Sequence, residues 1–176
     1  GLEVLPGGRV VLRIHPGLFG RLLHRVVAVA LLQVGLVPFL FENLSNEDLD
    51  YLEKNVKALE RTPEKRIEAI TELDLAFHKK LCLISGNSLI IRVNQILSDL
   101  FQKSMQDVVV ALGNQTGRVY HRRIFEAMRQ GNQKLTAAIL QEHIENTIHS
   151  IRQATLRQEP GPKQPQRRRT PRRQRR

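Results

Sequence analysis

The sequence predicts an all-α protein, an antiparallel bundle of six helices preceded by a short β-hairpin. Two observations predict this class. From residue 45 onward, apolar residues recur every three or four positions, which is the period of a helix with one buried face. Short breaks rich in glycine, asparagine or proline separate the helical segments. Because short connections favour antiparallel neighbours, the segments are expected to pack as a bundle.

Length and composition limit what else the chain can be. Its 176 residues (20.2 kDa) suffice for one domain with appendages, and 41% hydrophobic residues are enough to build a core. Tryptophan is absent and aromatic residues make up 5%, so the core must be aliphatic. The single cysteine, Cys82, excludes an internal disulfide and a four-cysteine zinc site. A lone cysteine also suits a reducing compartment, and we expect a cytoplasmic protein.

The first 15 residues differ from the rest of the chain. Residues 3–5 and 9–14 are rich in valine and leucine, and the turn-forming sequence Pro6-Gly7-Gly8 separates them. This pattern predicts a β-hairpin over residues 1–15. An isolated hairpin is marginally stable in water, so we expect it to belong to a structure that is not fully present in this chain.

Residues 26–41 form a 16-residue run without charge, after a basic stretch. A membrane-spanning helix needs about 20 apolar residues, and this run is short and interrupted by Gln33, Gly35 and Pro38. A signal peptide would fit the basic lead-in, but no clear cleavage site follows. We therefore expect a buried helix of the bundle and no membrane association.

Capping signals place the middle helices. Ser45 and Asp48 form a capping-box pattern that starts one helix, and Thr62-Pro63 suits the start of the next, which should end near Gly86. A fourth helix would carry apolar residues on one face and end near residue 113. That face is predicted to contain Leu89, Val93, Ile96, Leu97 and Leu100.

Two further helices are expected over residues 117–130 and from residue 133 to the late 150s. Gly131 and Asn132 separate them, because glycine can terminate one helix and asparagine can cap the following one.

The chain ends in a basic tail, residues 159–176. Residues 160–176 contain one lysine, seven arginines and no acidic residue, so they carry +8 of the net charge of +11 and leave +3 for the rest. With no apolar anchor, this tail is predicted to be disordered. It is either a solvated extension or a salt-dependent, non-specific binder of nucleic acid. The candidate phosphate contacts are Arg167, Arg168, Arg169, Arg172 and Arg173.

Polar residues fall on the inward stripes of three helices. Asp74 and His78 lie on the stripe that contains Ile70 and Phe77, although a carboxylate in an aliphatic bundle costs several kcal/mol unless it is paired or bound to metal. An aspartate and a histidine four residues apart on a helix lie one turn apart and can chelate one ion.

The last two helices add His121 and His143 to their inward stripes, whereas His149 should be exposed. At 1.5 Å per residue, His121 and His143 lie roughly 15 and 18 Å from the Gly131 turn, so their rings should be level across the hairpin. Three histidines and a carboxylate suit zinc foremost, and also nickel, manganese or iron. The alternative is a buried hydrogen-bond network without metal.

Three stretches resemble one protein family. Residues 74–87 are similar to the D-x-x-F-H…S-G-N signature of the ligand-binding (FCD) domain in FadR-type members of the GntR bacterial transcription regulators. Residues 121–144 resemble that family's H-x-x-I…A-I-x-x-G-D…H region, with Asn132 at the usual aspartate. Residues 44–49 match its L-S/T-x-E-D-L. Residues 1–12 are similar to the wing hairpin of the family's winged-helix DNA-binding domain.

This resemblance implies a bundle of six to seven antiparallel helices over residues 17–158 that senses an effector and forms a homodimer. It implies that Asp74, His78, His121 and His143 bind a divalent metal that helps to hold a small carboxylate metabolite. Candidate contacts of that carboxylate are Arg21 and Arg92. The helices that read DNA would lie upstream of Gly1, so we expect DNA binding only through a winged-helix region that is mostly absent from this chain.

Two other functions remain open at this point. A helical metalloenzyme could use the same four residues to activate water, and the basic tail could bind nucleic acid without sequence readout. No inward residue supplies an obvious general base, since Glu68 and Glu72 fall on the polar face. We therefore predict that the protein is not an enzyme.

Overall fold

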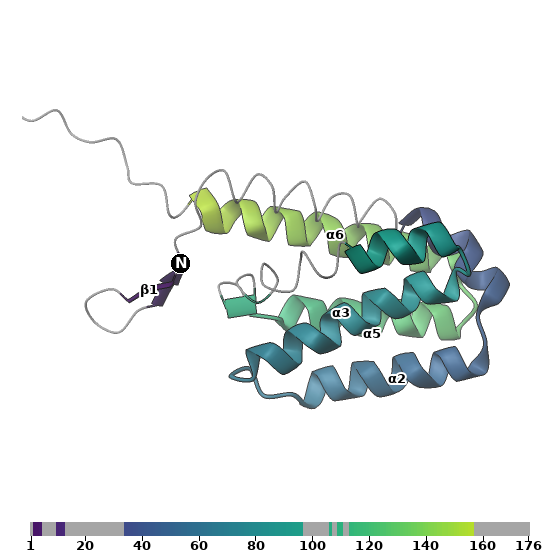
Figure 1. Ribbon diagram of the computed structural model, residues 1–176, viewed down its shortest axis with the longest axis horizontal. Helices are drawn as coiled ribbons and strands as arrows, with labels where there is room; N and C mark the ends of the chain where they lie inside the picture. The colour runs from purple at the N-terminus through teal and green to yellow at the C-terminus, as the bar shows by residue number, and fades with distance from the viewer. Residues whose placement is uncertain are drawn as a thin grey trace, which may run out of the picture.

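A computed structural model of the chain describes residues 2–4, 10–12, 34–96, 106, 109–110 and 113–156 (Figure 1). Strand β1 (Leu2–Val4) pairs antiparallel with β2 (Val10–Leu12), with Leu2 opposite Leu12 and Val4 opposite Val10. The rest of the described chain is helical apart from turns, in agreement with the predicted all-α class.

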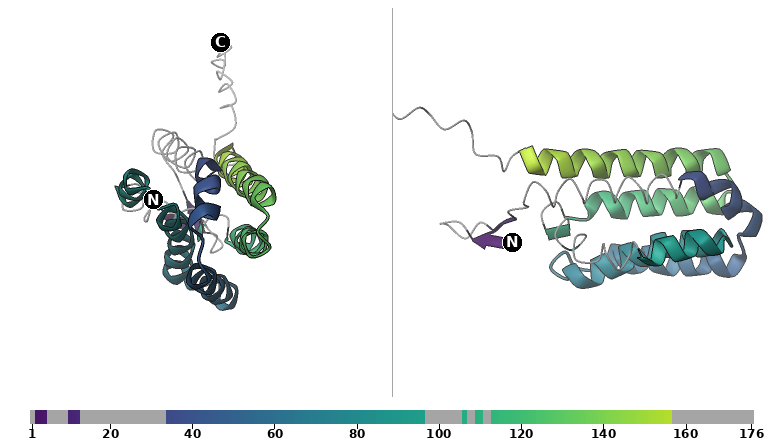
Figure 2. Two further views of the ribbon diagram at one scale, coloured as in Figure 1. Left: turned by 90° about the vertical axis from the view of Figure 1, so that its right-hand side faces the viewer. Right: turned by 45° about the horizontal axis from the view of Figure 1, so that its top comes forward.

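Four long helices run along one common direction (Figures 1 and 2). Helix α2 spans Asn46–Arg61, α3 spans Ile67–Ile84, α5 spans Gln115–Arg129 and α6 spans Gln133–Leu156. The α2–α3 and α5–α6 pairs are antiparallel hairpins, and α2 also packs against α5. Shorter helices cover residues 34–43 and 88–96.

The capping box at the start of α2 is present as predicted. The Ser45 hydroxyl accepts a hydrogen bond from the Asp48 backbone N–H (3.1 Å), and the Asp48 carboxylate accepts one from the Ser45 N–H (3.0 Å). The Asp48 carboxylate also pairs with Lys80 of α3 at 2.6 Å. The start of α2 is therefore fixed to the second half of α3.

The predicted start of the next helix is wrong. Helix α3 begins at Ile67, and Thr62 instead ends α2, where its hydroxyl donates to the Ala58 carbonyl (2.7 Å). Arg118 of α5 donates to the Thr62 carbonyl at 2.6 Å. These two side chains stabilise the end of α2, so the chain passes through a turn at Pro63 before it becomes helical again.

The predicted buried face of helix 88–96 is also wrong. Leu89 is 69% exposed and Ile96 is 62% exposed, whereas Asn94 is buried and Ile90 packs against the core. Apolar residues lie on both sides of this helix, so the helical period alone does not identify the inward one. Leu97 and Leu100 lie outside the described residues.

The turn between α5 and α6 follows the prediction. Gly131 has φ +69°, a conformation that glycine adopts without strain, and it terminates α5. The Asn132 side-chain carbonyl accepts a hydrogen bond from the Leu135 N–H (3.0 Å) and so caps α6.

The core is aliphatic, with two phenylalanines at its centre. Helix 34–43 contributes to it, which supports the expectation of a buried helix there, although residues 26–33 lie outside the described part. The largest fully buried side chains include Phe77, Phe125, Leu36, Leu40, Leu52, Leu81, Ile124, Met128 and Leu140. Cys82 is also buried, and this burial raises the pKa of its thiol to about 11. Among the described residues, no helix is long and apolar enough to cross a bilayer.

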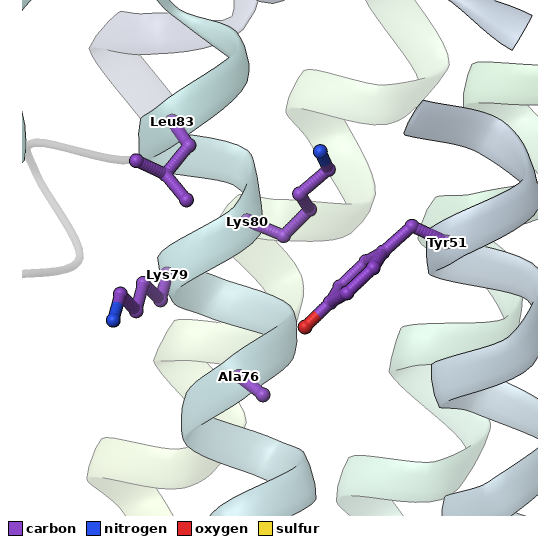
Figure 3. A pocket seen from close by; sticks show the side chains of 5 residues that line it. All are labelled: Tyr51, Ala76, Lys79, Lys80 and Leu83. Carbon is purple, nitrogen blue, oxygen red and sulfur yellow. The ribbon is translucent and has the colours of Figure 1, made fainter. Parts of the chain in front are cut away.

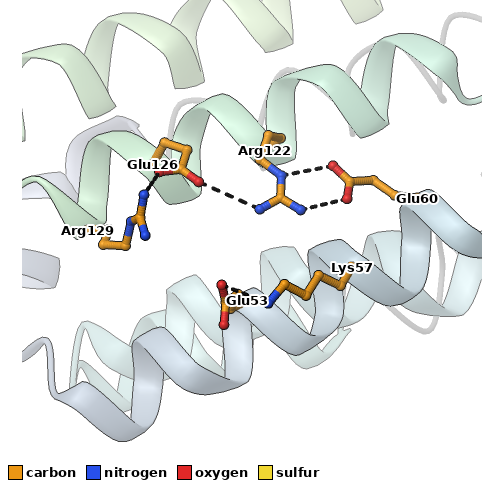
Figure 4. Close-up of polar contacts among 6 residues, drawn as sticks. All are labelled: Glu53, Lys57, Glu60, Arg122, Glu126 and Arg129. Carbon is orange, nitrogen blue, oxygen red and sulfur yellow. Dashed lines mark hydrogen bonds and ion pairs between the residues drawn. The ribbon is translucent and has the colours of Figure 1, made fainter.

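Ion pairs on the outer surface join α5 to α2 (Figure 4). Arg122 binds the Glu60 carboxylate with two nitrogens, at 2.8 and 2.6 Å, and it also lies 3.6 Å from Glu126. A bidentate pair of this kind restricts how α5 can slide along α2. It therefore helps to fix the height of the residues on the inner face of α5.

Candidate metal centre

Helix α3 supplies the first two polar residues of the site. Asp74 is 6% exposed and His78 is half-buried, one turn further along the same face. The outward face of α3 carries the exposed residues Glu68 and Glu72, as predicted. The hydrophobic stripe of α3 thus places both polar side chains against the neighbouring helices.

Helix α5 brings the third residue to these two. His121 is fully buried, and its Nε2 atom lies 3.1 Å from Nε2 of His78 and 3.6 Å from Oδ1 of Asp74. Room for the carboxylate comes from Gly117, one turn before His121, because a Cβ at that position would lie 3.3 Å from Oδ1 of Asp74.

The α5–α6 hairpin places the fourth residue, His143, at the height of His121. The centre of the His143 ring lies 5.4 Å from that of His121 and 5.6 Å from that of His78, to which it is parallel. One nitrogen from each of the three histidines can be chosen so that all three lie within 4.8 Å of one another. The three histidines selected by helical spacing are therefore neighbours, whereas Asp74 lies 3.6 Å from His121 and is not one of the three grouped residues. His149 is exposed as expected.

Burial determines the protonation of these residues. It lowers the pKa of His78 to about 3, with the neighbouring His143 adding to the effect, and it lowers the pKa of His143 to about 4. The pKa of His121 falls well below its ordinary value for the same reason. Burial raises the pKa of Asp74 to about 7. At neutral pH the imidazoles are uncharged, so each keeps a lone pair that a cation could bind.

The hydrogen bonds within the cluster leave some buried nitrogens unpaired. Nδ1 of His121 and Nδ1 of His143 are buried and have no hydrogen-bond partner within the part of the chain that the structure describes. Such atoms are costly in an apolar interior unless another interaction compensates them. The donor set, three imidazoles with one carboxylate, matches the ligands of zinc and related divalent metals.

Aromatic rings pack against two of the histidines. Phe77 is stacked on His121, with ring centres 4.1 Å apart and planes 9° apart, and Tyr120 lies 5.0 Å from the His143 ring. Tyr120 was not identified from the sequence as part of the site. The sequence could have indicated Tyr120 in one way. It directly precedes His121, and a hairpin of α5 and α6 brings side chains of α6 opposite it.

The other predicted binding residues are not brought to this site by the described structure. Arg92 is exposed on helix 88–96, whose buried face presents Asn94 instead. Arg21 and the five tail arginines, Arg167, Arg168, Arg169, Arg172 and Arg173, lie outside the described residues, as does the whole of 159–176.

A separate cavity of about 300 Å³ lies between α2 and α3 (Figure 3). It is lined by Tyr51, Ala76, Lys79, Lys80 and Leu83, and the Lys80 amine lies 5.1 Å from the centre of the Tyr51 ring. None of the four clustered polar residues lines it.

The profile of the FCD domain matches residues 26–146, well over half of the chain. The chain belongs to the FCD domain family. A comparison with curated protein sequences finds no match. The matched range includes Asp74, His78, His121 and His143, and the predicted resemblance to the ligand-binding domain of GntR-type regulators is confirmed.

Solved structures share the fold of this FCD domain. A GntR-family transcriptional regulator from Pseudomonas syringae pv. tomato str. DC3000 superposes with a TM-score of 0.70 at 15% identity, covering 89% of this chain and 65% of that one. Streptococcus agalactiae GntR superposes with a TM-score of 0.62 at 20% identity, covering 85% and 74%. The chain thus spans less than two thirds of the first of these regulators.

Proposed function

We propose that this FCD domain senses a small carboxylate effector with the help of one divalent metal, held by Asp74, His78, His121 and His143. Zinc is the foremost candidate, and nickel, manganese and iron suit the same ligands. The observation that carries the proposal is the 3.1 Å separation between the Nε2 atoms of His78 and His121.

That separation fits two ligands of a single ion, and it also fits a hydrogen bond between the two rings. Two nitrogens that each lie about 2.1 Å from a metal are roughly 3.0–3.4 Å apart at tetrahedral or octahedral angles. Neutral imidazoles and a carboxylate are also the protonation states in which these groups bind metal. The metal would supply positive charge in a site where the three histidines carry none.

The effector is proposed to be a carboxylate because four protein ligands leave positions on the metal open to an oxygen ligand. Arg21 remains a candidate for a contact to the rest of that molecule, whereas the exposed Arg92 could reach it only if helix 88–96 turned toward the site. An effector that binds one arrangement of the helices more tightly than another shifts the population toward it.

The proposed context is a cytoplasmic bacterial regulator of the GntR family. In it, the domain over residues 17–158 forms a homodimer and the β1–β2 hairpin is the wing of a DNA-binding domain. Contact with DNA would then come from the winged-helix domain to which this hairpin belongs, and the basic tail would be an extension of the effector-binding domain.

The test is the metal content of purified protein after exposure to zinc and dialysis against a limiting chelator. We expect about one equivalent in the wild type and little in His143→Ala, which removes one ligand. His149→Ala is the matched control, because His149 is an exposed histidine on the same helix. A wild type that retains no zinc, nickel or manganese would show that the four residues form a hydrogen-bond network instead.

A further inference from the structure

Two of the proposed ligands lack the contact that normally orients a metal-bound histidine. Such a histidine usually donates its second ring N–H to a carboxylate, a carbonyl or water, which fixes the direction of the ring. Nδ1 of His121 and Nδ1 of His143 have no protein partner of this kind among the described residues. Ring packing is the contact that the described residues offer to hold these two rings in place.

Aromatic rings pack against both histidines. Phe77 is stacked on His121, and the centre of the His143 ring lies 5.6 Å from that of the parallel His78 ring and 5.0 Å from that of Tyr120. Tyr120 is 6% exposed, so its ring has little room to move.

The hydroxyl of Tyr120 is anchored to the helix that carries His143. It donates a hydrogen bond to the Glu142 carboxylate (2.7 Å) and accepts one from the Asn146 side-chain amide. Glu142 directly precedes His143, and Asn146 follows it by about one turn. The two contacts therefore bracket His143 along α6 and fix Tyr120 at its height.

A third residue closes this network from α5. Arg123 pairs with the Glu142 carboxylate at 2.9 Å and lies over the Tyr120 ring, 5.1 Å from its centre. Tyr120 thus touches His143 with its ring while its hydroxyl and its outer face are held by charged and polar groups.

We propose that Tyr120 is a positioning residue, which sets the orientation of the His143 ring and through it the affinity and coordination geometry of the metal site. This inference rests on the proposed function. It states that Tyr120, which binds no metal itself, determines how tightly the imidazole of His143 binds the metal.

The experiment is a titration of the full chain with Co²⁺, followed by its visible absorption spectrum, in Tyr120→Phe and Tyr120→Leu. Loss of contacts that orient a ligand typically weakens metal binding 10–100-fold, and we expect a loss in that range for Tyr120→Leu. Tyr120→Phe keeps the ring but loses both hydroxyl contacts, so its loss should be smaller. The absorption bands of bound Co²⁺ should shift in both variants, because they report ligand geometry.

Tyr51, the only other tyrosine in the chain, provides matched controls. It is 44% exposed and lies in the α2–α3 cavity, so Tyr51→Phe and Tyr51→Leu should bind Co²⁺ with wild-type affinity and spectrum (Figure 3). Helical circular dichroism at the titration temperature shows which variants are folded. If Tyr120→Leu is not folded, Asn146→Ala replaces it, because that change removes one anchor and leaves the ring.

The outcomes separate the two proposals. Unchanged affinity and spectrum in the folded Tyr120 variants, with Co²⁺ bound by the wild type, would overturn the positioning role and leave the metal site standing. A wild type that binds no Co²⁺ would overturn both.

Discussion

Single residues determine whether a carboxylate can sit beside His121. Asp74 lies against the first turn of α5, where Gly117 leaves space for it. A Cβ at residue 117 would come 2.0 Å from the side-chain oxygen of Asn114 and 3.3 Å from Oδ1 of Asp74, so both side chains would have to shift. The glycine is therefore part of what shapes the site, although it carries no side chain to bind anything.

Replacement of Gly117 by alanine should distinguish two effects, the gain in stability from a better helix former and the loss of metal affinity from a displaced Asp74. Alanine in place of a helical glycine ordinarily stabilises by about 0.5–1 kcal/mol. Gly35→Ala, where an added Cβ meets no atom within 4 Å, should show that gain in urea unfolding. Gly117→Ala should gain less and should bind zinc more weakly, because Asp74 is displaced. Equal gains and equal zinc affinities in the two variants would contradict this assignment of Gly117.

At the level of helices, the α5–α6 hairpin is the element that makes the site, because it sets His121 level with His143. Its turn depends on Gly131 and on the Asn132 cap of α6.

Asn132→Ala should lower the free energy of unfolding by about 1 kcal/mol, since it leaves an amide of the first turn without its acceptor. Asn132→Asp keeps an acceptor and should stay near the wild type in the same urea titration. A loss of equal size in both variants would argue against capping as the cause.

The sequence predicts these elements to different degrees. Local signals, such as the Ser45 capping box and the Gly131-Asn132 break, predict their elements correctly because the interactions involve neighbours in the chain. The end of α2 could not be predicted, because Arg118, 56 residues away, binds the Thr62 carbonyl there. The buried side of helix 88–96 depends on which neighbours it meets, which its own apolar residues do not specify.

The residues of the candidate site could be predicted from the sequence more completely than the buried side of helix 88–96. Each of its members interrupts an otherwise apolar stripe, and the hairpin length fixes the heights of His121 and His143. Their rings do lie 5.4 Å apart. Tyr120 could not be identified in the same way, since its role depends on contacts with Glu142 and Asn146 that arise only once α5 and α6 are packed.

The stability of the whole molecule should depend on pH through the buried cluster. Each of the three clustered histidines has a lower pKa in the folded protein than its ordinary value of 6.5, with His78 at about 3 and His143 at about 4. Below pH 6.5 the unfolded chain therefore binds protons that the folded chain does not, and the stabilisation is lost as the pH falls. Asp74 acts in the opposite sense, because its pKa rises from 3.8 to about 7 on folding.

The three histidines bind more protons on unfolding than the one aspartate releases. The metal-free protein should therefore lose stability as the pH falls from about 6.5 to 4. A net difference of about two protons corresponds to at most about 2.7 kcal/mol per pH unit. Urea unfolding of chelator-treated protein at pH 7, 6 and 5 measures this slope. His143→Leu should reduce it by about one proton, whereas His149→Leu, on the exposed side of α6, should leave it unchanged. A flat profile in the wild type would mean that the folded chain takes up protons as readily as the unfolded chain, and it would contradict the lowered pKa values of the buried histidines.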